Sequence, residues 1–131
     1  IALAIAVTTS RLGEAQTLIF DEVDSGVGGA VAETVGRLMQ QLGRDRQVLA
    51  VTHLPQVAAC ADHHLQVSKR QAQDSGTGEG ARIESNVVPL LGEARGQEIA
   101  RMLGGERVSA TTLAHAREML SGKPVPTKAR A

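Results

Sequence analysis

Aromatic side chains are almost missing from this sequence of 131 residues, which has one Phe and neither Trp nor Tyr. Proteins that bind single-stranded nucleic acid without sequence preference usually stack its bases on such rings, so the composition argues against a stacking platform. An excess of charge of one sign is also missing, because 14 basic residues balance 14 acidic ones. The whole chain therefore gives no electrostatic case for a nucleic-acid partner.

The charge is unevenly spread, since residues 1–66 hold 4 basic and 7 acidic residues and residues 67–131 hold 10 basic and 7 acidic. Scattered charges of this kind are more typical of a solvated surface than of a phosphate track. The basic residues of the second half include Lys69, Arg70, Arg82, Lys123, Lys128 and Arg130.

Cys60 is the only cysteine, which excludes a disulfide scaffold and makes a reducing cytoplasm the natural setting. It lies in a small apolar run, residues 57–61, which predicts a buried structural thiol rather than a nucleophile. The first residues, 1–7, are also small or aliphatic, and no Met precedes them. That run is too short to span a bilayer and lacks the positive leader of a signal peptide. We expect a helix cut in the middle, and therefore a fragment.

Short apolar runs and helical spacings alternate along the rest of the chain. Residues 16–20 and 48–52 are typical of buried parallel strands, and Pro55 fits the first turn of a short helix. Residues 65–69 and 82–88 alternate like the strands of a hairpin around a polar turn at residues 74–80. Two helices should follow, over residues 93–103 and from a cap at Ser109 to about Leu120. Helical spacing also links Val31, Val35, Leu38, Met39 and Leu42, with Gly43 as C-cap.

This order predicts an α/β fold with a mostly parallel sheet, a hairpin and C-terminal helices. We expect one ordered unit over residues 1–121. The tail, residues 122–131, is basic and contains proline, which predicts disorder.

Three polar residues follow the two predicted parallel strands directly. Asp21 is placed to hold Mg²⁺, directly or through water, and Glu22 is placed to orient and deprotonate an attacking water. His53 follows the second strand and is able to donate a hydrogen bond to a terminal phosphate. Because ligands bind beyond the carboxyl ends of parallel strands, all three residues should share one sheet edge. Taken alone, the acidic pair is equally compatible with an ordinary loop after a strand, and a lone histidine is more typical of a surface or loop residue. The combination of the two motifs is much more specific.

A phosphate-cradling loop of the form G-x-x-x-x-G-K-[ST] is absent from the sequence. The only Gly-Lys pair, Gly122-Lys123, lacks the upstream glycine and is followed by Pro124. A complete nucleotide site is therefore not expected within this chain.

These residues resemble the ATP-binding-cassette group of P-loop ATPases, in its chromosome-maintenance branch. Residues 18–22 look like the Walker B strand with its catalytic Glu22, and Thr52-His53 looks like the switch histidine. Asp24, Ser25 and Gly26 look like the D-loop. Within that branch, residues 19–29, 51–58, 100–105 and 114–120 resemble the RecN family of bacterial DNA-repair proteins.

The resemblance implies the C-terminal lobe of a P-loop NTPase head in a cytoplasmic, nucleoid-associated ATPase of double-strand-break repair. ATP and Mg²⁺ would be its cofactors, with Asp21 at the metal and Glu22 and His53 as catalytic residues. It also implies a DNA partner and a homodimer of heads in which the D-loop residues bind nucleotide across the interface. The family's signature motif, Walker A loop, Q-loop and coiled coil are absent, so the isolated chain is expected to be inactive.

Other interpretations stay open. A transporter ATPase subunit usually carries Ser-Ala-Leu-Asp after the acids, which residues 24–27 do not fit well. The head of a different chromosome-maintenance ATPase would share the same motifs. A non-catalytic interaction module, in which the acids are only structural, belongs to another class altogether.

Overall fold

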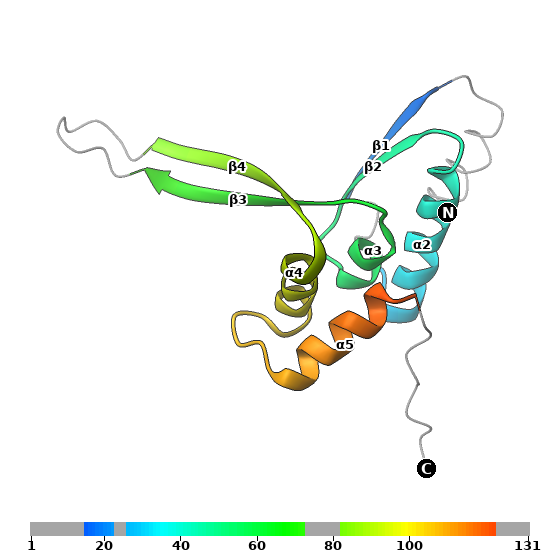
Figure 1. Cartoon of the computed structure of the whole chain (residues 1–131). Helices are drawn as coiled ribbons and strands as arrows, with labels where there is room; N and C mark the ends of the chain where they lie inside the picture. The colour runs from blue at the N-terminus through cyan, green and yellow to red at the C-terminus, as the bar shows by residue number, and fades with distance from the viewer. Residues whose placement is uncertain (1–14, 23–25, 73–81, 123–131) are drawn as a thin grey trace, which may run out of the picture.

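The computed structural model describes residues 15–22, 26–72 and 82–122. Figure 1 shows a helical body from which two small sheets extend in different directions. The elements run in the order β1 (Thr17–Asp21), α2 (Gly29–Leu42), β2 (Gln47–Val51), α3 (Pro55–Cys60), β3 (His64–Ala72), β4 (Arg82–Leu90), α4 (Gly92–Gly104) and α5 (Ala110–Leu120). The predicted α/β order is confirmed, with element boundaries shifted by a few residues.

Strands β1 and β2 pair in parallel, with Thr17 opposite Gln47 and Asp21 opposite Val51. Helix α2 is the crossover between them, and it packs its apolar stripe against one face of the pair. The resulting core contains Phe20, Ala32, Val35, Met39, Leu42 and Val57, with Leu18 and Val48 partly buried against it. One face of the two strands is thus fixed by apolar burial, which is the main source of their stability.

The opposite face of β1 and β2 carries Ile19, Leu49 and Val51, which are 70%, 43% and 58% exposed. The prediction of strands buried on both faces is therefore wrong for this face. An apolar strand is buried on both sides only where a second layer covers it. Within the described residues, α2 supplies a layer on one side only.

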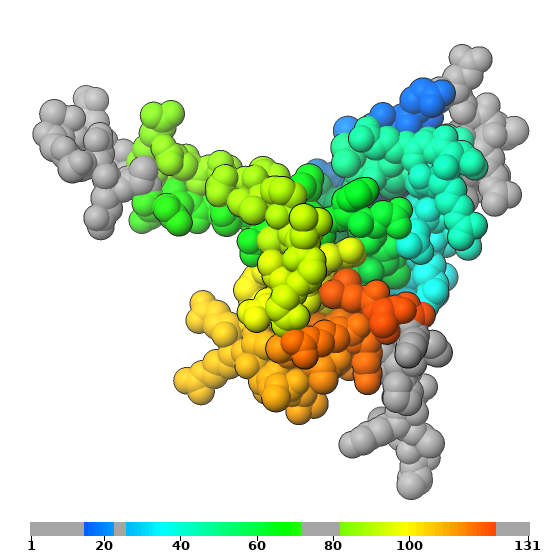
Figure 2. All heavy atoms as spheres, in the orientation of Figure 1, coloured from blue at the N-terminus to red at the C-terminus, as the bar shows by residue number. Residues whose placement is uncertain are grey.

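Strands β3 and β4 form the predicted hairpin, antiparallel from His64 opposite Leu90 to Ala72 opposite Arg82. The hairpin projects away from the helices (Figures 1 and 2). Residues on one face alternate with those on the other, as the pleat requires. One face carries four exposed apolar side chains, namely Leu65, Val67, Ile83 and Val87.

Helices α4 and α5 pack on each other and on α3 through a second core of Ala58, Ile99, Ala100 and Ala116. The last helix begins as predicted, because Ser109 Oγ accepts a hydrogen bond of 3.1 Å from the amide of Thr112. The predicted C-cap of α2 at Gly43 is confirmed as well.

Some predictions fall on residues outside the described ranges. These are the helix at residues 1–10, the turn at residues 74–80 and most of the tail at residues 122–131. Among the helices of the described part, none is long and apolar enough to cross a membrane.

A candidate nucleotide site at the end of the parallel strands

The carboxyl ends of β1 and β2 bring the predicted acids next to the predicted histidine segment. Asp21 is in register with Val51, and the amide of Glu22 donates a hydrogen bond of 3.3 Å to the carbonyl oxygen of Val51. Only Thr52 separates Val51 from His53 in the chain. The expectation that Asp21, Glu22 and His53 share one sheet edge is therefore confirmed at the level of the backbone.

Glu22 adopts a left-handed backbone conformation, with φ at 50°, and among the described residues no other non-glycine does so. This conformation costs an L-residue about 1–2 kcal/mol, because its Cβ crowds the following carbonyl oxygen. Non-glycine residues in such conformations cluster at functional sites, where the surrounding structure holds them. Here the hydrogen bond to Val51 holds the strained residue at the strand end.

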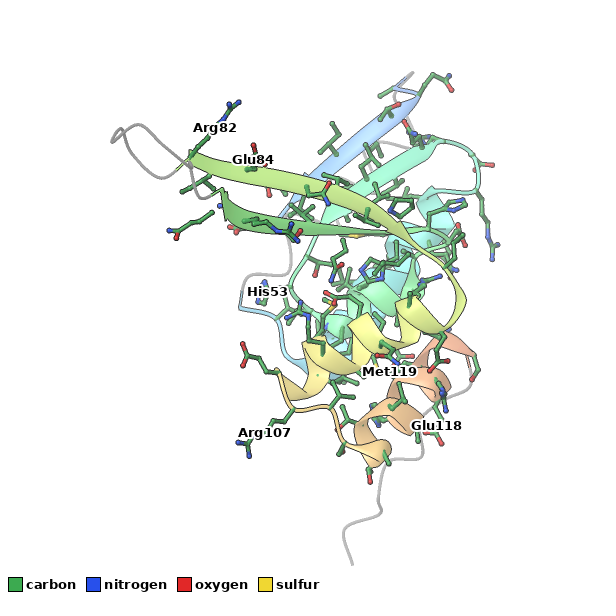
Figure 3. All side chains as sticks on the ribbon, turned by 60° about the vertical axis from the view of Figure 1, so that its left-hand side comes forward. His53, Arg82, Glu84, Arg107, Glu118 and Met119 are labelled. Carbon is green, nitrogen blue, oxygen red and sulfur yellow. The ribbon has the colours of Figure 1, made fainter. Side chains whose placement is uncertain are left out.

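His53 lies in a short, well-fixed connection between β2 and α3. The hydroxyl of Thr52 accepts a hydrogen bond of 3.0 Å from the amide of Leu54, which closes a turn around His53. Leu54 then caps α3, and its carbonyl oxygen accepts from the amides of Val57 and Ala58. The His53 side chain is exposed and points outward from this bend (Figure 3).

Asp21 and Glu22 are exposed as well. A carboxylate oxygen is the ligand type that Mg²⁺ prefers, and this ion usually keeps several waters and takes only one or two protein carboxylates. Within residues 15–22, 26–72 and 82–122, no three His, Cys, Asp or Glu side chains come together in a way that would hold a metal ion. The donor set present fits a magnesium ion that is shared with phosphate oxygens.

The predicted D-loop is only partly described, because Asp24 and Ser25 lie outside the described residues. Gly26 adopts a φ of +78°, and a Cβ added there would meet no atom within 4 Å. Glycine at this position is thus explained by its backbone conformation rather than by crowding.

Cys60 is half-buried, and its thiol lies 3.3 Å from the carbonyl oxygen of Gln56. Burial raises the pKa of this thiol above its ordinary value, with Arg37 acting in the opposite direction. A raised pKa lowers the thiolate fraction, which agrees with the predicted structural role.

Sequence reasoning missed a group of polar residues where α4 meets α3 and the base of the hairpin. Glu98 is 8% exposed and accepts hydrogen bonds from Gln66 Nε2 at 2.8 Å and from Arg101 Nη2 at 2.7 Å. Arg95 donates to the backbone of α3. A glutamate on the apolar stripe of a predicted helix is the one sequence signal that could have indicated this group.

The chain is similar to bacterial proteins named DNA repair protein RecN. It is 44% identical over 119 residues to the protein of Vibrio cholerae, 45% over 120 residues to that of Streptomyces coelicolor, and 48% over 120 residues to that of Mycobacterium leprae. The chain is RecN-like in sequence. The predicted resemblance to the RecN family is thereby confirmed over 91–92% of the chain.

These matches cover only 19–20% of the length of each RecN, so the chain spans about one fifth of the curated relatives it matches. No protein-family model matches the chain. Among solved structures, it resembles one from a study titled "Structural biochemistry of ATP-driven dimerization and DNA stimulated activation of SMC ATPases". That likeness has a TM-score of 0.61 at 23% identity and covers 81% of this chain and 58% of the other. The fold of this chain is thus similar to part of that solved structure.

Proposed function

We propose that this chain supplies the catalytic half of an ATP site in a RecN-like DNA-repair ATPase. The observation that carries the proposal is the pairing of β1 with β2, which sets Asp21 and Glu22 beside the segment of His53. The RecN-like sequence and the likeness of the fold to a solved structure from a study of SMC ATPases support it. ATP, Mg²⁺, DNA and a second head are the ligands and partners that belong to this proposal.

Each side chain has a separate role in the proposed site. Asp21 supplies a carboxylate oxygen to the metal, which neutralises charge on the phosphates when it is bound. Glu22 orients a water and accepts its proton, and the left-handed backbone turns this residue away from the line of β1. His53 donates a hydrogen bond to the terminal phosphate as charge develops there. Asp24, Ser25 and Gly26 contact nucleotide held by a second head.

The same proposal makes the isolated chain inactive. A phosphate-cradling loop normally supplies most contacts to the β- and γ-phosphates, and the sequence holds no such motif. Turnover by the highly purified chain, abolished by Glu22→Gln, would contradict this part of the proposal.

The experiment that tests the site compares Glu22→Gln with Asp21→Asn in the full-length RecN-like protein. Glu22→Gln keeps the size and the hydrogen bonds of the side chain but cannot accept a proton, so Mg-ATP should bind and hydrolysis should fall about 10²–10⁴-fold. If heads close around ATP and reopen after hydrolysis, this variant should also accumulate closed dimers. Asp21→Asn should instead weaken the metal and with it the productive binding of nucleotide.

The measurements are ATP affinity, single-turnover hydrolysis and head dimerisation. If Glu22→Gln hydrolysed ATP at the wild-type rate, Glu22 would not be the general base. If the two variants showed the same phenotype, Asp21 and Glu22 would not have the separate roles proposed here, even if both belong to the site.

A further inference from the structure

The position of His53 depends on α3, because the histidine directly precedes the residue that caps this helix. Leu54 is the N-cap and Pro55 the first residue of α3, so movement of the helix moves the connection that holds His53. Strand β2 fixes the other end of the same connection through its pairing with β1. Helix α3 has only six residues and cannot be held by its own hydrogen bonds. Its neighbours must therefore fix it.

Arg95 of α4 binds the carboxyl end of α3. Its Nη2 donates a hydrogen bond of 3.3 Å to the carbonyl oxygen of Ala58, and it donates another to that of Ala61. The Ala58 carbonyl lies in the last turn of α3, whose negative end a guanidinium stabilises, and Ala61 is the residue that caps the helix. Burial lowers the pKa of Arg95, with Asp62 acting in the opposite direction, so this cation is partly withdrawn from water to make the contact.

Helix α4 is itself held in place one turn further along. The carboxylate of Glu98 accepts from Arg101 Nε at 2.8 Å and Nη2 at 2.7 Å, and from Gln66 of β3 at 2.8 Å. A nearly buried carboxylate with three hydrogen bonds is expensive to disturb, because any bond that breaks leaves charge unpaired. Arg95 therefore contacts α3 from a helix whose own position is fixed against the hairpin.

We propose that Arg95 is a positioning residue for His53, acting through α3 to hold the histidine at the end of β2. This inference rests on the function proposed above, since it assigns Arg95 to the same reaction. Arg95 touches neither substrate nor metal in this proposal. Its effect on the rate should therefore pass entirely through His53.

The test is a double-mutant cycle in the full-length RecN-like protein. Arg95→Ala should lower the single-turnover rate of bound ATP about 10- to 100-fold, since a displacement of about 1 Å in a site can cost that much. The KM for ATP should change little. In a His53→Ala background the same substitution should have no further effect, because the residue through which it acts is gone. Independent, multiplying effects of the two substitutions would overturn the proposal, as would a wild-type rate for Arg95→Ala.

Two further variants separate positioning from general stability. Arg117→Ala is the matched control, because Arg117 also contacts α4, in an ion pair of 2.6 Å with Glu93 on the exposed side of that helix rather than in contacts with the carbonyls of α3. It should leave the rate unchanged. If Arg95→Ala does not fold, Arg95→Lys takes its place in the cycle. A lysine keeps the charge and can donate to the carbonyls, so it should restore part of the rate.

A second readout needs no ATP hydrolysis and keeps this inference distinct from the function proposed above. In the 131-residue chain, Arg95→Ala should shift the imidazole resonances of His53 and speed amide exchange at residues 57 and 58, whereas Arg117→Ala should do neither. Unchanged His53 resonances in Arg95→Ala would overturn the positioning role. The two proposals can fail separately. If Glu22→Gln hydrolysed ATP at the wild-type rate while Arg95→Ala still shifted the His53 resonances, the proposed function of Glu22 would be wrong, but Arg95 would still position His53 through α3.

Discussion

Glu22 combines a functional assignment with a backbone conformation that glycine would adopt more easily. A glutamate at this position therefore lowers the stability of the fold, because its backbone is held in the left-handed region. Left-handed backbone is open to glycine without steric penalty, and it is worst for β-branched side chains. The position thus gives a direct test of whether stability and activity are opposed at a single residue.

We expect Glu22→Gly to unfold at the same or a higher denaturant concentration than the wild type, because the relief of strain offsets the added chain entropy. Glu22→Val should lower the free energy of unfolding by about 1–2 kcal/mol. Chemical denaturation of the 131-residue chain, followed by circular dichroism, measures both. A stabilising Glu22→Val would mean that the left-handed conformation is not maintained in solution.

His53 gives the second prediction at this scale. In the full-length RecN-like protein, His53→Ala should slow hydrolysis about 10²–10³-fold, the usual cost of removing a donor that stabilises transition-state charge. Nucleotide affinity should be largely spared, since the interaction forms mainly in the transition state. Equilibrium binding and single-turnover rates decide the matter. Lost affinity with an unchanged rate per bound nucleotide would make His53 a binding residue instead.

The meeting of Asp21, Glu22 and His53 could be predicted from the sequence, because each follows an apolar run and parallel strands end at a common edge. The conformation of Glu22 could not, since glutamate shows no local preference for it. Arg95 could not be linked to α3 either. Its hydrogen-bond partners lie 34 and 37 positions away in the chain, and no periodicity reports a contact of that kind.

Helices α2 and α3 approach each other closely where Gly36 faces Cys60. A Cβ added to Gly36 would lie 2.9 Å from Cys60 Sγ and 3.1 Å from the Cα of Val57. The sequence predicted the helix but not this contact, because Gly36 lies between residues that fit the apolar stripe. Glycine is needed at position 36 because α3 packs too closely there to leave room for a side chain.

We expect Gly36→Ala to destabilise the chain by about 1–3 kcal/mol, as overpacking of a tight core does, despite the better helix propensity of alanine. Gly29→Ala is the matched control, since its Cβ would meet only Gln56 Nε2 at 3.8 Å. The control should unfold with the wild type or slightly later. Thermal melts of both variants test this, and a stabilising Gly36→Ala would show that the two helices are not so close.

Two titratable side chains, His64 and Glu98, lie near the base of the hairpin. Their contributions to stability are lost over different pH ranges. Burial and Arg95 lower the pKa of His64 below its ordinary 6.5, with Glu98 acting in the opposite direction. Hydrogen bonding from Arg101 lowers the pKa of Glu98 below 4.5, against the effect of burial. Both groups therefore contribute stability that is present above their unfolded-state pKa and is lost as the pH falls.

Unfolding experiments should accordingly show stability falling in two steps, first below pH 6.5 from His64 and then below pH 4.5 from Glu98. His64→Phe should remove the first step, because Phe carries no charge and replaces a buried Nδ1 that has no hydrogen-bond partner among the described residues. His63→Gln, at the exposed neighbouring position, should keep it. A first step that survives His64→Phe would point to another group.

On the scale of the whole molecule, the described residues expose many large apolar side chains to solvent. Ile19 and Val51 lie exposed on one sheet, and Leu65, Val67 and Ile83 lie exposed on the hairpin. Patches of this kind on isolated domains mark surfaces that another partner covers or that promote aggregation. The sequence predicted the hairpin but did not indicate that one of its faces would be apolar and exposed.

We therefore expect the 131-residue chain to self-associate as its concentration rises, measured by sedimentation velocity. Val67→Glu combined with Ile83→Lys should reduce association, because both residues lie on the apolar face of the hairpin. Ser68→Glu with Asn86→Lys alters the opposite face by the same charges and should leave association unchanged. A sharp monomer peak for the wild type at every concentration would contradict the expectation.

The parallel pairing also sets the order in which parts of the molecule can form. Thr17 and Gln47 are 30 positions apart, whereas Ala72 and Arg82 at the distal end of the hairpin are 10 positions apart. Closing the longer loop costs more chain entropy, and non-local pairings form more slowly than local ones. The hairpin and the α4–α5 pair are therefore local folding units. Because α2 connects the two strands, we expect the site to assemble only after this helix has docked, and its local opening to depend on the same helix.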